Sequence, residues 1–395
     1  MKILLAHNFY RSSAPSGEDA VYRNERSLLE AHFEVVRFEK FNDDLDDSTA
    51  AKKIGLALSG AWSKATYDEL GRLIRKTRPD VAHFHNTFPQ ITPSAWAACQ
   101  ENGVPVVQTL HNYRYICPGA LLQREGEPCE DCLRGSLVNA LRHRCYRDSL
   151  TATAAQGWMI ARNRWNGSFR ARVDRYIALT GFAAERLSMG GLPRDRIVIK
   201  PNFLPDAPEA GTGEGGYAIY TGRLSQEKGV RTLLKAWSKI SADIPLKLAG
   251  DGPLRNELEA YVKEKRIKAE FLGYCDRERI IELVGNAALQ IVPSEWYEGF
   301  PMVILEAYAC GTPVLASRIG SLDEVVEEGV TGHKFTPGNV DSLAETVDKL
   351  LANPEGLRAL RPRVRQRFLS EYTTEANLRR ITDLYRGLTM RASAA

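Results

Sequence analysis

The sequence has no long apolar run and little net charge of either sign. No apolar stretch approaches the roughly 18 residues that a membrane-spanning helix requires, so no span is expected. The formal net charge is only +4 over 395 residues, which gives no indication of a nucleic-acid-binding protein. Residues 1–8, M-K-I-L-L-A-H-N, become polar too early for a signal peptide and predict a first strand instead. These absences predict a globular protein of the cytoplasm.

Cysteine is scarce, and the seven thiols are expected to be reduced unless they hold a metal. Four of them follow the pattern C-x11-C-x2-C-x12-C, at Cys117, Cys129, Cys132 and Cys145. A C-x-x-C pair with two flanking thiolates can complete a tetrahedral zinc site. Four reduced thiols or a transient disulfide are the alternatives. Any zinc here would be structural, because four protein ligands leave no open coordination position.

The length of the chain predicts two domains, since 395 residues exceed one ordinary core. Apolar runs typical of strands alternate with helical patterns in both halves, which predicts α/β domains with parallel sheets. The expected strands are residues 3–6, 35–38, 81–84, 104–110 and 176–179 in the first half and 217–220, 246–249, 269–272, 289–292 and 314–316 in the second.

Domain boundaries follow from composition. Residues 1–205 form the expected first domain, with a cysteine-containing insertion at 117–147. Residues 206–216 are rich in Pro, Gly and Glu, and we expect an unpacked hinge linker there. Residues 217–372 form the expected second domain, and a helical segment with a short tail occupies 373–395.

The most specific pattern is P-S-E-W-Y-E-G-F-P-M-V-I-L-E at residues 293–306. An apolar run before it predicts a buried strand, and Pro301 suits the first position of a helix. Glu298 is therefore expected in the loop after a strand, and Glu306 inside the next helix. The free N–H groups at that helix start suit an anion. An ordinary surface Glu and a helix Glu bonded to a neighbour are the alternative.

This segment resembles the E-x7-E signature of the family 4 glycosyltransferases, which are retaining enzymes of GT-B fold. That fold has two Rossmann-like domains facing across a cleft and a final helix that crosses back to the first domain. The resemblance implies that Glu306 binds the nucleotide ribose. It also implies that the transferred sugar lies beside Glu298, Gly299, Phe300, Pro301 and Met302.

A second pattern, T-G-R-L-S-Q-E-K-G, follows the predicted strand at 217–220. Arg223 and Lys228 are the residue types that a departing diphosphate requires, although loop cations are usually only solvated. The pattern resembles the diphosphate clamp of the same family, which needs no metal or other cofactor for catalysis. Gly250 and Gly273 follow the next two strands, where the resemblance implies contact with the nucleotide. A plain tight turn is the alternative at Gly250.

In the first half, His111 ends a predicted strand in Q-T-L-H-N, and the resemblance implies a place near the donor sugar. His85 ends another strand and is a second candidate, for acceptor binding or as a supporting histidine. Gly17 follows the first strand, where many family members carry two glycines whose backbone approaches phosphate or acceptor. Ser16 replaces one of these glycines, so the loop conformation stays open.

Residues 142–175 carry eight arginines against two aspartates, with Trp158, Trp165 and Phe169 interleaved. This pattern suits anionic lipid headgroups or a diphosphate-linked lipid acceptor, and a solvated helix face is the alternative. A peripheral position at the inner face of the membrane is therefore a candidate location. The expected partners are a nucleotide-sugar donor and a saccharide or lipid-linked acceptor, and no nucleic acid.

The expected function is that of a retaining transferase acting in bacterial surface-polysaccharide synthesis. It would move a hexose from a nucleotide sugar to a glycan or lipid-linked saccharide. UDP-glucose is the favoured donor because uridine donors are common in the family. One alternative is a GT-B sugar-nucleotide epimerase, which the E-x7-E and clamp patterns disfavour. Another is a catalytically silent nucleotide-sugar-binding partner in a polysaccharide-assembly complex, which the intact Glu298, Glu306, Arg223 and Lys228 disfavour.

Overall fold

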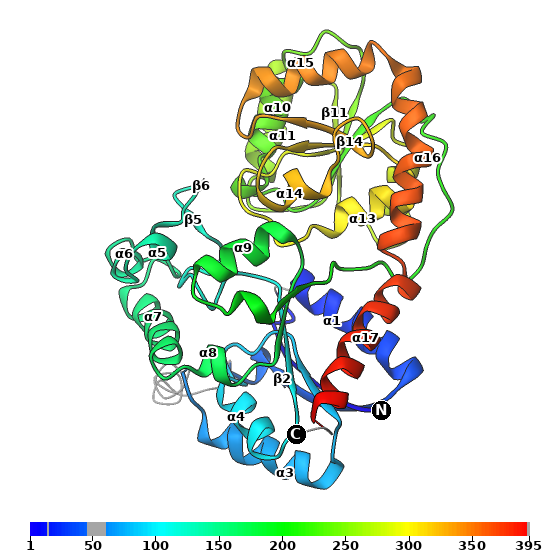
Figure 1. Cartoon of the computed structure of the whole chain (residues 1–395). Coiled ribbons are helices and arrows are strands. Elements are labelled where there is room, and N and C mark those ends of the chain that lie inside the picture. Colours follow the sequence, from blue (N-terminus) through cyan, green and yellow to red (C-terminus); the bar gives the residue numbers. More distant parts are fainter. Residues whose placement is uncertain (14–15, 46–60, 393–395) are drawn as a thin grey trace. The chain divides into compact units, whose positions relative to one another are not determined.

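The computed structural model describes residues 1–13, 16–45 and 61–392 (Figure 1). The chain separates into two compact units. The first unit consists of Met1–Leu122, Cys129–Asn202 and Asn377–Ala395, and the second of Gln123–Pro128 and Phe203–Ala376. Each unit carries one six-stranded sheet, as the repeated alternation of strands and helices in the sequence predicts.

The sheet of the first unit has the order β2-β1-β3-β4-β7-β8, and all neighbouring strands are parallel. Its strands are β1 (Lys2–Phe9), β2 (Glu34–Phe41), β3 (Val81–Phe84), β4 (Val106–Leu110), β7 (Arg175–Ala178) and β8 (Ile197–Ile199). The order changes direction at β1, because β2 lies on one side of it and β3 on the other. The carboxyl ends of strands at such a reversal are the usual ligand-binding edge of an open parallel sheet.

Some helices of the first unit begin at side-chain caps that the sequence supplies. Ser16 accepts a hydrogen bond from the Glu18 N–H, and Asp19 completes a capping box at the start of α1. The helices joining the strands are α1 (Gly17–His32), α3 (Lys64–Thr77), α4 (Ser94–Glu101) and α9 (Gly181–Met189). Between β4 and β7 lie β5 (Gln123–Arg124), β6 (Glu127–Pro128), α5 (Asp131–Arg134), α6 (Val138–Arg142), α7 (Leu150–Trp165) and α8 (Ser168–Ala171).

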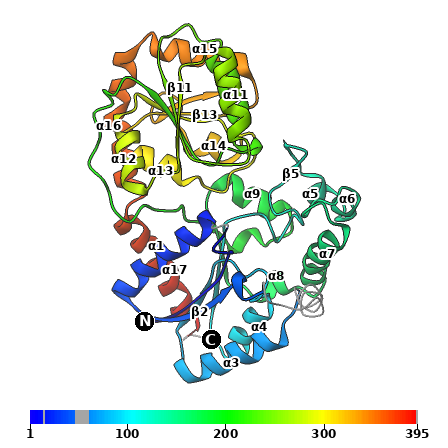
Figure 2. The same ribbon diagram turned by 180° about the vertical axis from the view of Figure 1, so that it is seen from behind.

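Helix α17 (Thr374–Ala392) completes the core of the first unit. Ile381, Tyr385 and Leu388 are buried in one cluster with side chains of β1 and α1. Figure 2 shows α17 beside α1, in agreement with that cluster. The prediction that the final helical segment crosses back to the first domain is confirmed, while residues 393–395 of the predicted tail lie outside the described residues.

The sheet of the second unit has the order β11-β10-β9-β12-β13-β14, again entirely parallel. Its strands are β9 (Ala218–Thr221), β10 (Leu246–Ala249), β11 (Ala269–Gly273), β12 (Leu289–Val292), β13 (Val314–Ser317) and β14 (Gly332–Phe335). This is the strand order of a dinucleotide-binding sheet, and its reversal lies between β9 and β12. The loops after these two strands therefore emerge side by side.

The helices of the second unit pack in two groups (Figure 1). One group contains α10 (Val230–Trp237), α11 (Arg255–Lys265) and α15 (Val340–Leu351), and the other contains α12 (Arg277–Asn286), α13 (Met302–Ala309) and α16 (Pro354–Glu371). The short α14 (Gly320–Val325) follows β13. Within the described ranges of both units, no helix combines the length and the apolar character that crossing a membrane requires.

The segment 206–216 belongs to the second unit, and most of its residues are exposed. The expectation of an unpacked linker does not hold at Gly211 and Gly213, which contact helix ends of the same unit. The N–H groups of Gly211 and Gly213 donate to the carbonyls of Cys310 and Gly285, both at 3.0 Å. A Cβ on Gly211 would lie 2.2 Å from the Gly285 oxygen. The last carbonyls of a helix lack partners within the helix, and the small residues of this segment let its backbone reach them.

Candidate functional site

Lys228 and Glu298 meet where the strand order of the second unit reverses. Lys228 ends a short turn after β9, and Glu298 lies in the loop after β12. The Lys228 Nζ is 2.6 Å from the Glu298 Oε1, and the Ser294 hydroxyl donates to the same oxygen at 2.7 Å. Glu298 is only 5% exposed. The structure thus brings together one residue from each of the two sequence patterns.

A glycine allows these two loops to approach each other. Gly229 has φ 68°, and a Cβ there would lie 1.9 Å from the Pro293 carbonyl oxygen. Only glycine avoids both the backbone strain and this collision. The Glu295 N–H also donates to the Glu227 carbonyl at 2.9 Å, which ties the loops together. Packing of the two loops therefore requires the glycine of the E-K-G pattern, which directly follows Lys228.

The loops after β9, β10 and β11 lie against one another at the same sheet edge. The N–H of Gly250 donates to the Gly273 carbonyl at 2.7 Å, and its own Cβ position lies 1.9 Å from the Gly222 oxygen. Gly250 and Gly273 both have positive φ. Arg223 extends from the first of these loops and is exposed. Arg223 and Gly250 are thus placed on the loops after β9 and β10, beside Gly273 at the end of β11, and the close backbone approach accounts for Gly250.

Glu306 lies in α13, the helix that follows the Glu298 loop. Its carboxylate is partly exposed and makes no hydrogen bond or ion pair with the residues that the structure describes. Burial raises the pKa of Glu306, and the nearby Arg277 guanidinium opposes that rise. An unpaired carboxylate in such surroundings is a candidate binding group, because hydrogen-bond donors of a ligand would satisfy it.

The start of α13 differs by one residue from the expectation. Pro301 has an extended backbone, with φ −74° and ψ 121°, and precedes the helix as its cap, so Met302 is the first helical residue. Gly299 and Phe300 lead into this helix start. The buried Gln290 amide donates to the Thr221 hydroxyl at 2.9 Å and to the Val303 carbonyl at 3.2 Å. This side chain positions the helix start relative to β9 and β12.

In the first unit, His111 follows β4 and contacts His85, which follows β3. The His85 Nδ1 and the His111 Nε2 are 2.9 Å apart. Burial, and secondarily the neighbouring His85, lower the pKa of His111 well below the ordinary imidazole value. His111 is therefore neutral at neutral pH and has one donor and one acceptor nitrogen. Both predicted histidines lie together at the carboxyl edge of the sheet.

Glu18 is a candidate that sequence reasoning missed. It lines a small hollow with His85, His111 and Asn112. Its carboxylate accepts hydrogen bonds from the Asn112 amide at 2.7 Å and from the Tyr10 hydroxyl at 3.2 Å. Burial raises the pKa of Glu18, although the Asn112 hydrogen bond opposes the rise. The sequence signal that could have identified Glu18 is its position directly after Gly17, which is a predicted site residue.

Gly17 itself has no packing requirement for glycine. A Cβ at this position would meet nothing within 4 Å, and the residue is the first of α1. Ser16 caps this helix. The conformation left open by the sequence is therefore a capped helix start, and no side chain that the structure describes fills the space beside Gly17.

The predicted zinc site at Cys117, Cys129, Cys132 and Cys145 is not supported. Burial and the three neighbouring thiols raise the pKa of Cys132 to about 11, so the four lie in one region. Thiolates on one zinc would be about 3.8 Å apart, from a Zn–S distance of about 2.3 Å. No three of these sulfurs lie within 4.8 Å of one another in the described structure. All four are free cysteines in this structure.

Two family models together match residues 26–367 of the chain. One, described as "Glycosyltransferase Family 4", matches residues 26–207, and the other, "Glycosyl transferases group 1", matches residues 208–367. Their junction falls within the segment that joins the two sheets.

Proteins with similar sequences include a glycosyltransferase and a glycogen synthase. An uncharacterised glycosyltransferase of Methanocaldococcus jannaschii is 30% identical over 262 residues, which are 65% of this chain and 68% of the relative. The glycogen synthase of Mycobacterium tuberculosis is 28% identical over 306 residues, 75% of this chain. The matched part spans 66% of that synthase, just under two thirds of its length.

A solved structure shares the fold. The HepE protein of Anabaena, crystallised in complex with UDP, superposes with a TM-score of 0.69 at 17% sequence identity. The superposition covers 98% of this chain and 100% of HepE. Similarity at this level of identity shows that the two parallel α/β units are arranged in a known fold, and the chemistry is argued from the residues themselves.

Proposed function

The chain belongs to the family 4 glycosyltransferases of GT-B fold, and we propose that it transfers a hexose, with retention of configuration, from a UDP-sugar to a saccharide acceptor. The observation that carries this proposal is the Lys228–Glu298 pair at the strand reversal of the second unit. UDP-glucose is the proposed donor, a choice supported by the UDP bound to the structurally similar HepE. Surface-polysaccharide synthesis is the proposed setting.

The proposed roles follow from charge. Negative charge grows on the diphosphate as the glycosidic bond breaks, and cations placed beforehand stabilise it. Lys228 is held by Glu298 and remains 26% exposed at its side chain, so it can also reach a ligand. Arg223 extends from the same loop. The amide groups at the start of α13 offer further donors. This scheme uses no metal ion or organic cofactor.

Nucleotide binding tests the proposal most directly. Calorimetric titration of the wild type with UDP, GDP and ADP should give binding of one nucleotide, expected to be UDP. Glu306→Ala removes the proposed ribose acceptor, and hydrogen bonds to a carboxylate contribute about 1.5–3 kcal/mol, so affinity should fall at least about tenfold.

Glu345→Ala is the matched control, because Glu345 is an exposed helical glutamate of the same unit. It should bind the nucleotide like the wild type. Absence of nucleotide binding by the wild type would overturn the proposed function, and equal affinities of Glu306→Ala and wild type would overturn the role of Glu306.

We also propose that helices α6 and α7 contact an anionic membrane surface or a lipid-linked acceptor. A hollow of about 790 Å³ between them is lined mainly by apolar side chains, including Leu137, Val138 and Leu141. On the same hollow, Trp158 is 55% exposed and Trp165 is 88% exposed. Exposed tryptophans among arginines suit the boundary between headgroups and acyl chains.

Vesicle binding tests this contact. In a sedimentation assay, most of the wild-type protein should pellet with phosphatidylglycerol vesicles. Much less of it should pellet with vesicles of pure phosphatidylcholine. The double variant Trp158→Ala/Trp165→Ala should lose most of the binding. Tyr274→Ala, which removes an 86% exposed aromatic from the second unit, should not. Equal sedimentation of the wild type with both vesicle types would contradict the proposal.

A further inference from the structure

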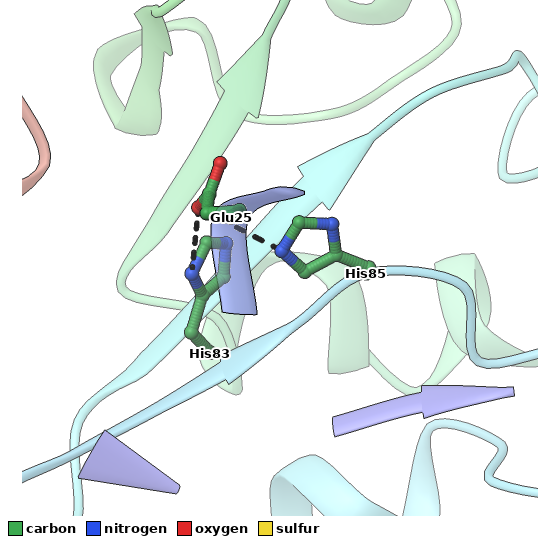
Figure 3. Close-up of side chains that lie close together, drawn as sticks. All are labelled: Glu25, His83 and His85. Carbon is green, nitrogen blue, oxygen red and sulfur yellow. Dashed lines mark ion pairs between the residues drawn. The ribbon is translucent and has the colours of Figure 1, made fainter. Parts of the chain in front are cut away.

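A chain of buried polar side chains reaches His111 from the interior of the first unit. Glu25 of α1 is 1% exposed, and its Oε2 is 2.8 Å from the Lys200 Nζ. Its Oε1 is 3.4 Å from the His83 Nδ1 and 3.7 Å from the His85 Nε2. Figure 3 shows the Glu25 carboxylate facing these two rings. His85 in turn contacts His111 through its other ring nitrogen. The four elements that supply these residues are far apart in the sequence.

Two atoms in this series of buried polar side chains have unused hydrogen-bonding capacity. The Glu25 Oε1 and the His85 Nε2 are both buried, and neither has a hydrogen-bond partner among the residues that the structure describes. Buried polar atoms are nearly always hydrogen-bonded, so such a facing pair calls for a reason. A contribution to folding stability is a weak reason, because a buried ion pair such as Glu25–Lys200 stabilises a protein little more than apolar packing does.

A metal ion does not fit the group Glu25, His83 and His85, although their ligand atoms lie within 4.8 Å of one another. The Lys200 ammonium already neutralises Glu25. Both nitrogens of His83 are engaged, Nδ1 with the Tyr385 hydroxyl at 2.6 Å and Nε2 with the Thr109 hydroxyl at 2.7 Å. A cation would have to displace these partners and lie beside an existing positive charge.

The protonation states of the group are set by its surroundings. Burial opposes ionisation of Glu25, yet the Lys200 ammonium holds the pKa of Glu25 well below its usual value, so the group is a carboxylate. Burial lowers the pKa values of His83 and His111 well below the imidazole value, so both rings are neutral at neutral pH. A neutral imidazole has one N–H and one acceptor nitrogen, and the partner of one nitrogen decides the state of the other.

We propose that Glu25 is a positioning residue that selects the tautomer of His111 through His85. The Glu25 carboxylate favours a proton on the His85 Nε2, which leaves the His85 Nδ1 as an acceptor. The only proton that can fill the 2.9 Å contact is then on the His111 Nε2. The His111 Nδ1 is consequently a hydrogen-bond acceptor, suited to a sugar hydroxyl. This use of the acceptor rests on the proposed function, whereas the tautomer assignment does not.

The neighbours of Glu25 support this orientation. His83 is held between Tyr385 of α17 and Thr109 of β4, and it faces the same carboxylate oxygen as His85. Lys200 follows β8 and holds the other oxygen. Lys200 thus holds one carboxylate oxygen, while His83 and His85 face the other. The 3.7 Å separation from His85 is short enough to act electrostatically and to close with a small movement.

Nitrogen-15 NMR of histidine-labelled full-length protein tests the proposal without any substrate. In the wild type, both His85 and His111 should carry their proton on Nε2. The variant Glu25→Gln/Lys200→Met removes both members of the buried ion pair together, and His111 should then become a mixture of tautomers. A further readout is hydrolysis of UDP-glucose, in which kcat should fall at least about fivefold with little change in KM.

Glu39→Gln is the matched control. Glu39 is partly buried in the same unit and accepts from the Tyr22 hydroxyl at 2.8 Å and from Arg26 at 2.9 Å, and its loss should leave the His111 signals unchanged. A wild-type His111 protonated at Nδ1 would overturn the proposal even if the double variant failed to fold. An unchanged His111 tautomer in a folded double variant would also overturn it. Failure of UDP binding would instead overturn the proposed function and leave the tautomer result standing.

Discussion

Glu298 is a nearly buried carboxylate whose charge is balanced by one partly exposed lysine. The 2.6 Å contact with Lys228 and the 2.7 Å contact with Ser294 both fall on the same oxygen, Oε1. A residue pair of this kind is suited to a site that receives a charged ligand, because the lysine is oriented before the ligand arrives. At the residue scale, the proposed function therefore depends on whether Lys228 can bind the ligand while it remains paired with Glu298.

We predict that Lys228→Met lowers kcat for UDP-glucose hydrolysis by about 100-fold, since removal of one preorganised group that stabilises developing charge has an effect of this size. Steady-state kinetics measure the change. Lys263→Met, an exposed lysine on α11, should retain the wild-type rate. A kcat within twofold of the wild type for Lys228→Met would contradict the proposed clamp.

We predict that Glu306→Gln stabilises the protein at pH 8 while it weakens nucleotide binding. Burial raises the pKa of Glu306 in the folded state. As pH rises above the unfolded-state pKa, the unfolded chain releases this proton first, so the wild type loses stability that the glutamine variant keeps. Thermal melts should show a higher Tm for Glu306→Gln at pH 8 and little difference at pH 4. A lower Tm for the variant at pH 8 would contradict this assignment.

At the element scale, two loops of the second unit bring Lys228 and Glu298 together. The loop after β9 and the loop after β12 meet because the strand order reverses between them. Gly229 permits that contact, and the buried Gln290 links β12 to β9 and to the start of α13. The sequence patterns predict each loop separately, and the sheet order is what places them side by side.

We predict that Gly229→Ala weakens UDP binding at least about tenfold and destabilises the protein by a few kcal/mol, because the added Cβ would collide with the Pro293 carbonyl and φ is 68°. Urea denaturation and calorimetry measure the two effects. Gly387→Ala is the control, since its Cβ meets nothing within 4 Å in helix α17. It should stabilise by about 0.5–1 kcal/mol. Unchanged UDP affinity in Gly229→Ala would refute the packing argument.

At the scale of the whole molecule, each unit presents candidate residues at the carboxyl edge of its own parallel sheet. His85 and His111 follow neighbouring strands of the first sheet, and Lys228 and Glu298 follow neighbouring strands of the second. The last helix of the chain, α17, belongs to the core of the first unit. The first unit is therefore complete only when the end of the chain has been added to it.

We predict that Ile381→Ala destabilises the first unit by about 2–4 kcal/mol, because it leaves a cavity in the cluster that joins α17 to β1 and α1. Circular dichroism melts and hydrogen exchange of the β1 amides measure the effect. Met390→Ala changes a 74% exposed side chain of the same helix and should leave both measurements unchanged. Equal β1 protection in Ile381→Ala and wild type would show that α17 does not stabilise this core.

The limits of sequence reasoning are visible at particular residues. Lys228 and Glu298 were identified because each lies in a short pattern directly after an apolar strand, which is a local signal. Glu18 was missed because its carboxylate gains meaning only from Asn112 and Tyr10, which other elements bring beside it. The contacts of Gly211 and Gly213 were missed because the carbonyls to which they donate, those of Cys310 and Gly285, lie at helix ends far along the chain.

The alternation of apolar patterns in the sequence by itself determined the two parallel α/β units, because hydrophobic periodicity is a local signal. Short motifs marked the residues of the loops after β9 and β12, and the return of the last helix was implied by the family resemblance that these motifs carry. Only the tertiary structure decided that Glu25, Lys200 and His85 stand behind His111, and that the four cysteines lie in one region of the first unit without support for a zinc site. These contacts depend on strand order and on packing between distant segments, and neither is encoded in local spacing.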